Sequence, residues 1–373
     1  MKKNKPSIAV IGLKGLPAFG GAATVGENII EQIKDKYDFT VYSTSTHTDL
    51  KTGDYNGYKQ IVFKAFFIKK INVFIYYILS AVHSLTCHYD LIHLHHSDWA
   101  FIIPILKIKN RVLLTSHGSP NRLGNRTFKY NKVITNFFKF SERVFLKKAD
   151  TVSCVSRTLA EFLRREFNKE IHYIPNGFSY AKVNNNFLER EFSEKYILFA
   201  AGRILPTKGC HIFLEALKKN KYSNKIIIVG DYEQIPSYYE VLIKIAQSMD
   251  VIFTGMIKDK NRLNSIISNA ELFVFPSSYE AMSMMLLEVA SLKVPIICSE
   301  IDENRSIFND DEILFFKTDD VSDLAIKLKN AENNKVLMNQ KAQNAFTRLE
   351  HDYLWDSISK KYEKLYQRII QKG

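Results

Sequence analysis

Short apolar runs alternate with amphipathic segments along most of this chain, and that alternation limits the folds that it can adopt. Such a pattern is typical of a parallel sheet whose strands are joined by crossover helices. The first half of the chain predicts strands at 8–12, 39–43, 61–63, 91–95, 112–115, 151–155 and 172–174. Between them it predicts helices at 25–36, 73–85, 99–106, 133–146 and 159–167.

A polar stretch at 179–195 then interrupts the alternation; it follows Pro175-Asn176-Gly177 and contains an asparagine run, which is the composition of a linker. After it the alternation restarts. Strands are expected at 196–201, 226–230, 251–255, 272–275, 296–299 and 313–316, with helices between them and three more closing the chain. We therefore expect an α/β protein with two doubly wound, Rossmann-like domains, 1–178 and 196–351. Ligands of such sheets bind beyond the carboxyl ends of the strands, so two facing sheets would form a deep cleft.

The cysteines and the apolar segments indicate in which cellular compartment the chain is expected. The four cysteines are scattered without a C-x-x-C pair, so neither a disulfide framework nor a zinc knuckle is indicated, and a reducing compartment fits. The apolar stretch 8–13 is too short for a signal peptide and runs into a glycine turn. The uncharged stretch 71–89 is long enough to span a membrane, but its polar residues favour a packed or surface helix.

The net charge of +13 is unevenly distributed between the two halves of the chain. Residues 1–185 carry +14 and residues 186–373 carry −1. An excess confined to one half indicates an anionic partner, for which a membrane surface, an anionic glycan and a nucleic acid are the candidates. No recognisable nucleic-acid-binding module is present, so we expect no nucleic-acid partner.

In each predicted domain a glycine-containing loop directly follows the first strand. Gly12-Leu13-Lys14-Gly15-Leu16-Pro17, followed by Gly20-Gly21, lies between a strand and a helix, where free N–H groups can bind an anion. Its spacing is not that of a dinucleotide fingerprint, and a plain connection is the alternative. Gly202-Arg203 and Lys208-Gly209 follow the first strand of the second domain. There the two cations suit a diphosphate. The alternative is that both side chains are simply exposed to solvent, as most arginines and lysines are.

The segment from Glu280 to Glu288 places two carboxylates eight residues apart after a strand and a Pro-Ser-Ser turn. In a continuous helix that spacing would be about 12 Å of rise, too far for both to act on one bond. They can instead hold two ends of an extended ligand, because carboxylates accept hydrogen bonds from sugar hydroxyls. A surface glutamate and a buried, paired one are the structural alternative, and the methionines between them read as core.

Histidines follow two strands of the first domain. His117 stands in Thr115-Ser116-His117-Gly118, where a lone histidine is most often structural. His93 and His95 share one face of a strand and His96 does not, which leaves a metal site as a minor alternative. The chain contains no Asp-x-Asp, the motif that commonly presents carboxylates to a metal ion bridging a diphosphate. We expect neither a metal nor another cofactor.

Together these segments resemble the retaining nucleotide-sugar glycosyltransferases of family 4, which have the GT-B fold, over almost the whole chain. The segment 276–288 resembles that family's E-x7-E signature, and the loop 13–21 resembles the glycine loop of members that build bacterial surface polysaccharide, such as capsule and lipopolysaccharide. His117-Gly118, Ile174-Pro175-Asn176-Gly177 and Val229-Gly230-Asp231 also match. The end of the chain, 352–373, resembles the helix that packs back on the first, acceptor-binding domain.

The resemblance implies roles for individual residues. Arg203 and Lys208 would hold the donor diphosphate, and Glu288 would bind the ribose hydroxyls. Glu280 would hold the transferred sugar, which His117 would contact from the opposite wall. The other donor-binding residues implied are Gly20, Gly21, Gly202, Gly230, Met256, Ile257, Met282, Ser283 and Met284. His117, Arg203, Lys208 and Glu280 are therefore the expected catalytic residues.

Two departures from the family pattern bear on these roles. Gly20-Gly21-Ala22-Ala23 lacks the acidic residue of Gly-Gly-x-Glu, and Ala281 replaces the glycine that often follows the first glutamate.

The resemblance implies front-face substitution, in which a phosphate oxygen of the leaving group takes the acceptor's proton.

The expected function is therefore transfer from a nucleotide sugar, UDP first and GDP second, to a glycan or lipid-linked acceptor. The expected location is the cytoplasm, with peripheral contact at the inner face of an anionic membrane. The alternatives are a GT-B-type sugar-nucleotide epimerase and a non-enzymatic protein that binds polyanions.

Overall fold

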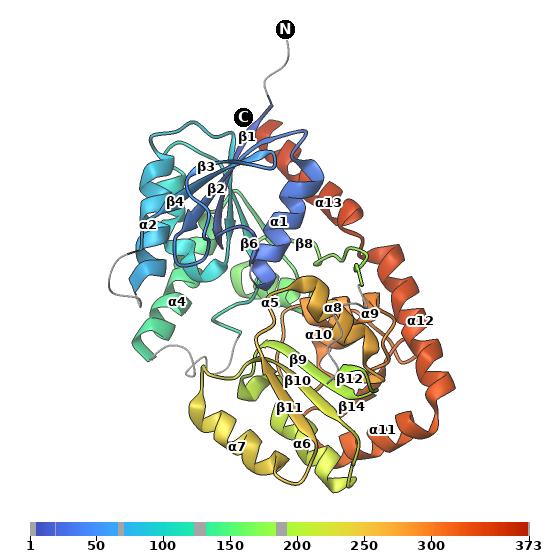
Figure 1. Ribbon diagram of the computed structural model, residues 1–373. Helices are drawn as coiled ribbons and strands as arrows, with labels where there is room; N and C mark the ends of the chain where they lie inside the picture. Colours follow the sequence, from blue (N-terminus) through green and yellow to red (C-terminus); the bar gives the residue numbers. More distant parts are fainter. Residues whose placement is uncertain (1–4, 19, 66–70, 123–131, 184–191, 372–373) are drawn as a thin grey trace. The chain divides into compact units, whose positions relative to one another are not determined.

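The computed structural model describes residues 5–18, 20–65, 71–122, 132–183 and 192–371. The chain forms two compact units (Figure 1). The first consists of Met1–Asn176 together with Trp355–Gly373, and the second of Gly177–Leu354. The predicted linker 179–195 thus falls within the second unit, and its residues 184–191 lie outside the described residues.

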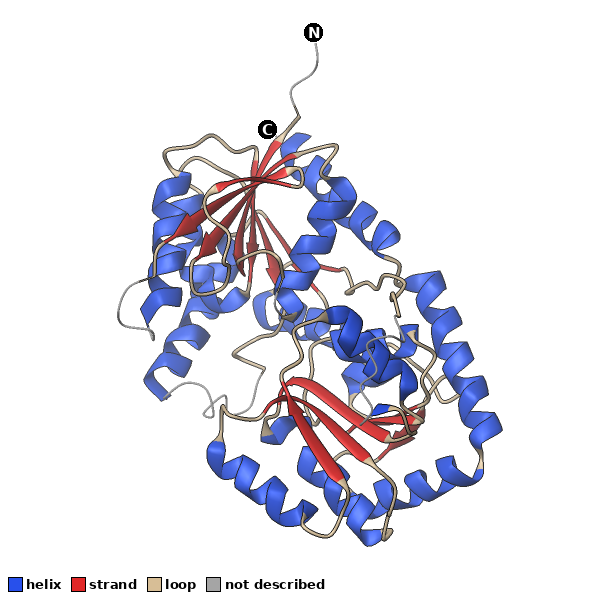
Figure 2. Ribbon diagram, in the orientation of Figure 1, coloured by secondary structure: helices blue, strands red, loops and turns tan. Residues whose placement is uncertain are grey.

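The first unit is built on a sheet that, in the described residues, has eight strands in the order β3-β4-β2-β1-β5-β6-β7-β8. All neighbouring strands are parallel except β3 and β4. The strands are β1 (Ser7–Lys14), β2 (Asp38–Thr44), β3 (Gly53–Tyr55), β4 (Tyr58–Phe63), β5 (Leu91–His95), β6 (Val112–Ser116), β7 (Thr151–Cys154) and β8 (Ile171–Tyr173). Helices flank this sheet (Figure 2).

The helices of the first unit come from both ends of the chain. They are α1 (Gly21–Ile33), α2 (Asn72–Ser84), the 3-10 helix η2 (Ser97–Ile102), α3 (Ile103–Leu106), α4 (Lys132–Phe145), the 3-10 helix η4 (Leu146–Lys148), α5 (Arg157–Phe167) and α13 (Trp355–Gln371). In the part of the chain that the structure describes, no helix is both long and apolar enough to cross a bilayer.

The second unit has a parallel sheet of six described strands in the order β11-β10-β9-β12-β13-β14. The strands are β9 (Ile197–Arg203), β10 (Ile226–Asp231), β11 (Val251–Gly255), β12 (Leu272–Phe275), β13 (Ile296–Ser299) and β14 (Leu314–Phe316). The helical elements are η7 (Pro206–Lys208), α6 (Cys210–Lys219), α7 (Pro236–Ala246), α8 (Lys260–Asn269), α9 (Met284–Ser291), α10 (Asp302–Arg305), α11 (Val321–Asn333) and α12 (Lys335–Asp352).

Both sheets therefore have the predicted doubly wound architecture, and most predicted strands lie within one or two residues of the observed ones. Three differences have local causes. Helix α1 begins at Gly21, four residues before the predicted start, because Gly20 at φ +115° lets the chain turn directly into the helix. The predicted helix 99–106 is instead the 3-10 helix η2, which begins at Ser97 and contains the non-helical Trp99, followed by the short α3. The sequence analysis missed β3, which is only three residues long and contains Gly53 and Asp54, poor strand formers.

The strands β5, β6, β12 and β13 are buried at every position. Such strands need apolar residues on both faces, which is why they read as continuous apolar runs in the sequence. The histidines of β5 are exceptions that the fold must accommodate inside the first core.

The C-terminal helix α13 belongs to the first unit. It contacts α1 and the residues that follow α1: Lys36 Nζ lies 2.8 Å from Glu363 Oε2, and the rings of Tyr37 and Tyr366 meet edge to face at 5.7 Å. Arg111 also donates to the carbonyl oxygen of Ile369 at 2.6 Å. The first core is thus completed by residues from the far end of the sequence.

Candidate functional site

The strand order of the second sheet reverses direction between β9 and β12. The chain passes from β9 to β10 and β11 on one side, and later from β12 to β13 and β14 on the other. At such a switch point the loops beyond the carboxyl ends of the two central strands diverge and leave room for a ligand. The loops at this point are 204–209 and 276–283, which contain the predicted Lys208 and Glu280.

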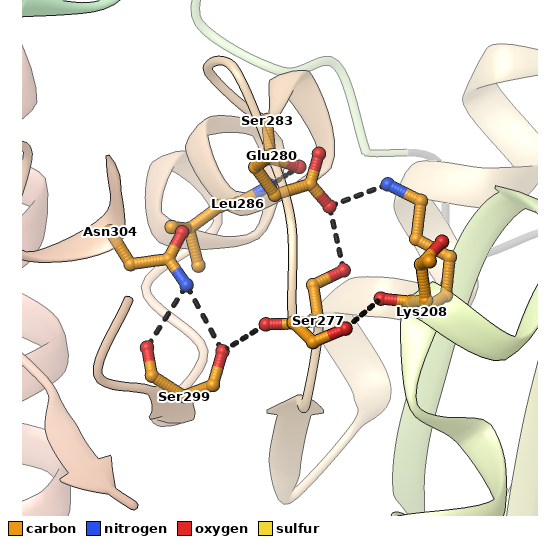
Figure 3. A network of polar contacts seen from close by, with 9 residues as sticks. Lys208, Ser277, Glu280, Ser283, Leu286, Ser299 and Asn304 are labelled. Atoms are coloured by element: carbon orange, nitrogen blue, oxygen red, sulfur yellow. Dashed lines mark hydrogen bonds and ion pairs between the residues drawn. The ribbon is translucent and has the colours of Figure 1, made fainter. Parts of the chain in front are cut away.

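Lys208 and Glu280 form an ion pair, with Lys208 Nζ 2.5 Å from Glu280 Oε1 (Figure 3). The same carboxylate oxygen accepts a hydrogen bond from Ser277 Oγ at 2.7 Å. Both partners are largely buried, since their side chains are 24% and 10% exposed. The sequence analysis assigned these residues to different parts of the ligand, and the structure shows that they lie together.

A second layer of polar contacts holds this pair in place (Figure 3). Ser299 Oγ donates to the carbonyl oxygen of Ser277 at 2.5 Å, and Asn304 Nδ2 donates to the carbonyl oxygen of Ser299 at 3.0 Å. All three side chains are buried. The sequence analysis included Ser277 in the segment 276–288 but gave it no role, and it missed Ser299 and Asn304, which carry no signal that distinguishes them from other polar residues.

Backbone contacts bring the two loops against each other. Ser278 N donates to the carbonyl oxygen of Thr207 at 2.9 Å. Gly209 has φ +71°, and a Cβ there would lie 2.1 Å from the carbonyl oxygen of Pro276. Only glycine fits so close an approach, which places Lys208 beside the carboxylate.

Two further features of this edge of the sheet suit an anion. Arg203, at the end of β9, is exposed, and in the described residues its side chain has neither a hydrogen bond nor an ion pair. Gly202 beside it leaves open space where a Cβ would stand. Helix α6 begins at Cys210 with neither a side-chain cap nor an acidic residue in its first turn. A free guanidinium beside an uncapped helix start favours an anion.

Glu288 has a partner of its own. Helix α9 begins only at Met284, after Ser283, whose side chain caps it by accepting from Leu286 N, so Glu280 lies before the helix and Glu288 within it. Glu288 Oε1 lies 3.1 Å from Nζ of Lys260, the first residue of α8. The sequence analysis did not single out Lys260. The two glutamates thus belong to separate contacts.

The remaining predicted donor residues of this unit lie at the same carboxyl edge. Met256 and Ile257 directly follow β11 and are half-buried and buried, respectively. Met282 is buried in the loop before α9. Gly230, the last residue but one of β10, has φ +146°, and a Cβ there would lie 2.0 Å from the carbonyl oxygen of Ala201, so packing alone requires a glycine at this position.

In the first unit the predicted glycine loop divides into two parts. Gly12, at φ +112°, passes so close to β5 that a Cβ would lie 2.4 Å from the carbonyl oxygen of His95. Gly20 instead faces open space at the N-terminus of α1, which has neither a side-chain cap nor an acidic residue in its first turn. Packing explains the first glycine, and the pair Gly20-Gly21 leaves an uncapped helix start.

His117 lies at the end of a row of histidines. His95 Nδ1 is 2.9 Å from His117 Nε2, and the ring of His93 lies 4.1 Å from that of His95. Burial lowers the pKa of His117 to about 4 and that of His93 to about 3, and it lowers the pKa of His95 well below its ordinary value. All three rings are therefore neutral at pH 7. In the described residues no group of three or more histidine, cysteine, aspartate or glutamate side chains could hold a metal ion.

Comparison with known families gives two matches that together span most of the chain. Residues 19–182 match the model described as Glycosyltransferase Family 4, and residues 184–348 match Glycosyl transferases group 1. The chain is 26% identical, over 92% of its length and 94% of the relative's, to an N,N'-diacetylbacillosaminyl-diphospho-undecaprenol alpha-1,3-N-acetylgalactosaminyltransferase of Campylobacter jejuni.

Other curated relatives are matched over part of their length. The capsular polysaccharide biosynthesis glycosyltransferase CapM of Staphylococcus aureus is 23% identical, with 53% of this chain and 54% of the relative covered. The putative teichuronic acid biosynthesis glycosyltransferase TuaC of Bacillus subtilis is 24% identical, with 71% and 62% covered. The chain thus spans roughly half to three fifths of the length of these two relatives.

Solved structures show the same fold. The sucrose-phosphate synthase of Thermosynechococcus elongatus superposes with a TM-score of 0.82 at 17% identity, over 99% of this chain and all of the other. HepE of Anabaena, solved with UDP and glucose, gives a TM-score of 0.72 at 15% identity, over 97% of this chain and all of the other. Taken with the family matches and the site at the switch point, these likenesses show that the chain belongs to the GT-B glycosyltransferases of the family 4 type.

Proposed function

We propose that this protein transfers a sugar, with retention of anomeric configuration, from a nucleoside diphosphate sugar to an acceptor in cell-surface polysaccharide synthesis. The observation that carries the proposal is the Lys208–Glu280 pair at the switch point of the second sheet, together with Arg203 at the end of β9, whose side chain has no ion-pair partner among the described residues. A diphosphate satisfies the cations, and sugar hydroxyls satisfy the carboxylate.

We propose UDP as the nucleotide, with GDP second. HepE of Anabaena was solved with UDP, and one Escherichia coli relative, 24% identical, is a UDP-Gal:alpha-D-GlcNAc-diphosphoundecaprenol alpha-1,3-galactosyltransferase. On this chain, Glu288 would accept hydrogen bonds from the ribose, and the backbone of Met256 and Ile257 would flank the base. The lysine that pairs with Glu288 is largely exposed and can move away from it.

The proposed chemistry relies on positioning and charge. Arg203 and Lys208 would neutralise the charge that develops on the leaving diphosphate, so neither a metal nor another cofactor is needed. The bond from the anomeric carbon to the diphosphate would break while the acceptor oxygen bonds to that carbon from the same face of the sugar. A phosphate oxygen of the leaving diphosphate would take the acceptor's proton. Glu280 would orient the transferred sugar through its hydroxyls, and His117 would contact the same sugar.

For the acceptor we propose a lipid-linked glycan, reached from the inner face of an anionic membrane. Two curated relatives are named for diphospho-undecaprenol acceptors. Helix α4 supports membrane contact, because the apolar residues Val133, Ile134, Phe137, Phe140 and Val144 are all at least 40% exposed. Lys132 and Arg143 on α4, and Lys147 and Lys148 after it, are exposed as well. Basic residues beside exposed apolar ones suit an anionic leaflet.

The structure divides the aromatic residues of this region into two groups. Phe138 is buried and Phe145 packs against the first core, whereas Phe137 and Phe140 are exposed. The sequence also has basic and aromatic residues shortly before α2 and α4 that would suit the same contact, but they lie outside the described part of the chain: Lys69, Lys70, Arg126, Phe128, Lys129 and Tyr130.

Nucleotide binding and transfer by two matched variants test the donor site. Glu288→Gln should weaken binding of free UDP, since the lost partner is the ribose. Glu280→Gln should leave the affinity for UDP nearly unchanged and lower the rate of transfer, because its partner is the sugar. Both are measured by calorimetry with UDP and by transfer from the nucleotide sugar that most raises the melting temperature. Equal loss of UDP affinity in both variants would contradict the assignment.

The stereochemistry and the acceptor requirement test the rest of the proposal. The anomeric configuration of the product should equal that of the donor by NMR. A sugar-nucleotide epimerase, the alternative enzyme, would convert the donor with no acceptor present. Conversion without acceptor would therefore favour the epimerase.

A further inference from the structure

His95 connects the proposed sugar-contacting residue to the core of the first unit. It is fully buried on β5, and its ring lies nearly in the plane of the His117 ring, with 13° between them. The nitrogen lone pair of an imidazole lies in the ring plane, so this arrangement is that of an N–H···N hydrogen bond. The 2.9 Å between His95 Nδ1 and His117 Nε2 agrees with it.

Because both rings are neutral, only one of these two nitrogens carries the shared hydrogen. Each choice determines whether the second nitrogen of each ring is protonated. If His117 donates, the hydrogen of His95 must be on Nε2. That nitrogen is buried and has no hydrogen-bond partner in the described residues. If His95 donates from Nδ1, its Nε2 is a bare acceptor. In proteins, a buried N–H group without an acceptor is rarer than a buried acceptor without a donor, so donation from His95 Nδ1 is favoured.

We propose that His95 is a positioning residue that donates from Nδ1 to His117, and that His117 therefore presents an N–H group on its own Nδ1. The inference rests on the proposed function for the identity of what this N–H contacts, a hydroxyl oxygen of the transferred sugar. His117 Nδ1 is suited to that contact. In the described residues it has no hydrogen-bond partner, and it is not among the buried unpaired atoms.

A second layer of contacts keeps His95 in place. His93 Nδ1 lies 2.8 Å from the Tyr366 hydroxyl, and His93 Nε2 lies 2.6 Å from Thr115 Oγ1. Thr115 Oγ1 in turn lies 2.7 Å from Ser153 Oγ. The ring of His93, fixed at both nitrogens, packs 4.1 Å from that of His95. His95 is thus confined on one side by a fixed ring and bonded on the other to His117.

The tautomer of His117 can be read directly from the protein. In the full chain labelled with 15N-histidine, NMR separates protonated from unprotonated ring nitrogens, and loss of signals in His117→Asn assigns the ring. We expect hydrogen on Nδ1 at pH 7.5, before any ligand is added. Hydrogen on Nε2 of His117 would overturn the proposal.

Two substitutions at His95 test its role in transfer. His95→Asn retains an amide N–H near the position of Nδ1, and His95→Leu retains bulk without a donor. We expect His95→Asn to keep most of kcat. His95→Leu should lose about 10–100-fold in kcat, by analogy with the loss of partners that orient metal-binding histidines, with UDP affinity unchanged. Equal kcat values in the two variants would contradict the proposal.

His93→Asn is the matched control, because it disturbs the same buried row without removing the bond to His117. It should lower the melting temperature and leave the His117 tautomer on Nδ1. The NMR result does not depend on transfer, so failure of the proposed function leaves it standing. Sugar transfer with hydrogen on Nε2 of His117 would overturn this inference alone.

Discussion

At the residue scale, the donor-site cation and carboxylate are partners before any ligand arrives. Lys208 and Glu280 neutralise each other in a largely buried position, where an isolated charge is costly. A bound diphosphate would draw Lys208 toward itself, and Ser277 would still donate to the carboxylate. Arg203, which has no such partner in the described residues, is the cation available to a ligand from the start.

Arg203→Ala should therefore cost about 2–4 kcal/mol of transition-state stabilisation, calculated from the fall in kcat/KM. This is the loss typical of removing one group that stabilises developing charge. Activity of the wild-type protein should survive EDTA, because under the proposed function these cations do the electrostatic work of a metal ion. Steady-state kinetics measure both. Lys195→Ala is the control, since this exposed lysine lies just before the opposite end of β9. Full activity of Arg203→Ala, or abolition of activity by EDTA, would refute the assignment.

The buried histidines should make the fold sensitive to acid. Since the pKa of His117 is about 4 and that of His93 about 3, the unfolded chain binds more protons below about pH 6.5. The free energy of unfolding should thus fall as the pH decreases from about 6.5 toward 4, by up to about 1.4 kcal/mol per pH unit for each histidine. Urea denaturation of wild type and His117→Asn at several pH values measures this. The variant should show a shallower dependence; identical slopes would show that His117 titrates normally.

At the scale of elements, α4 buries polar residues beside the apolar Phe138. Ser141 and Glu142 on it are fully buried, and Glu142 accepts hydrogen bonds from Ser119 Oγ at 2.5 Å and Asn121 Nδ2 at 2.8 Å. Its apolar residues Phe137 and Phe140 are exposed instead. The buried carboxylate thus ties the loop after His117 to α4, while the apolar face remains available to a lipid surface.

Reversing Lys147 and Lys148 to Glu should weaken binding to anionic vesicles by at least about 2 kcal/mol, roughly 30-fold, because each lost basic residue contributes about 1 kcal/mol near the leaflet and each new carboxylate is repelled by it. Co-sedimentation with anionic and neutral vesicles at low and high salt measures this. Reversal of Lys327 and Lys329 on α11 is the control for net charge. Vesicle binding that is indifferent to lipid charge, or unchanged by the first pair, would favour a soluble acceptor.

At the scale of the whole molecule, the last helix stabilises the first unit. The Tyr366 hydroxyl contacts His93 on β5, and its ring contacts Tyr37 after α1. The chain therefore completes its first core only after the second unit has been synthesised.

Removal of 355–373 should consequently destabilise the first unit more than the second. Hydrogen exchange measured by mass spectrometry should show faster exchange in β1, β5 and β6 of the truncated chain, with β9 and β12 close to wild type. A shorter truncation at 371 is the control, because it leaves α13 intact. Unchanged exchange in β1 and β5 would show that α13 contributes little to that core.

The sequence by itself determined the two doubly wound sheets and the loops that carry the site. The continuous apolar runs of the buried strands β12 and β13 predict the bounds that these strands have, because strands covered on both faces must be apolar on both faces. The positions of Arg203, Lys208, Glu280 and Glu288 beyond strand ends follow from the same local pattern, and the family resemblance gave them roles.

Only the tertiary structure decided which of these residues meet. The pairing of Lys208 with Glu280 depends on the parallel neighbours β9 and β12, whose order in the sheet no local pattern encodes. The same holds for Ser299 and Asn304 behind Ser277, and for Tyr366 against His93. Local propensity acts between residues a few positions apart, whereas these contacts join segments brought together by burial of a common core.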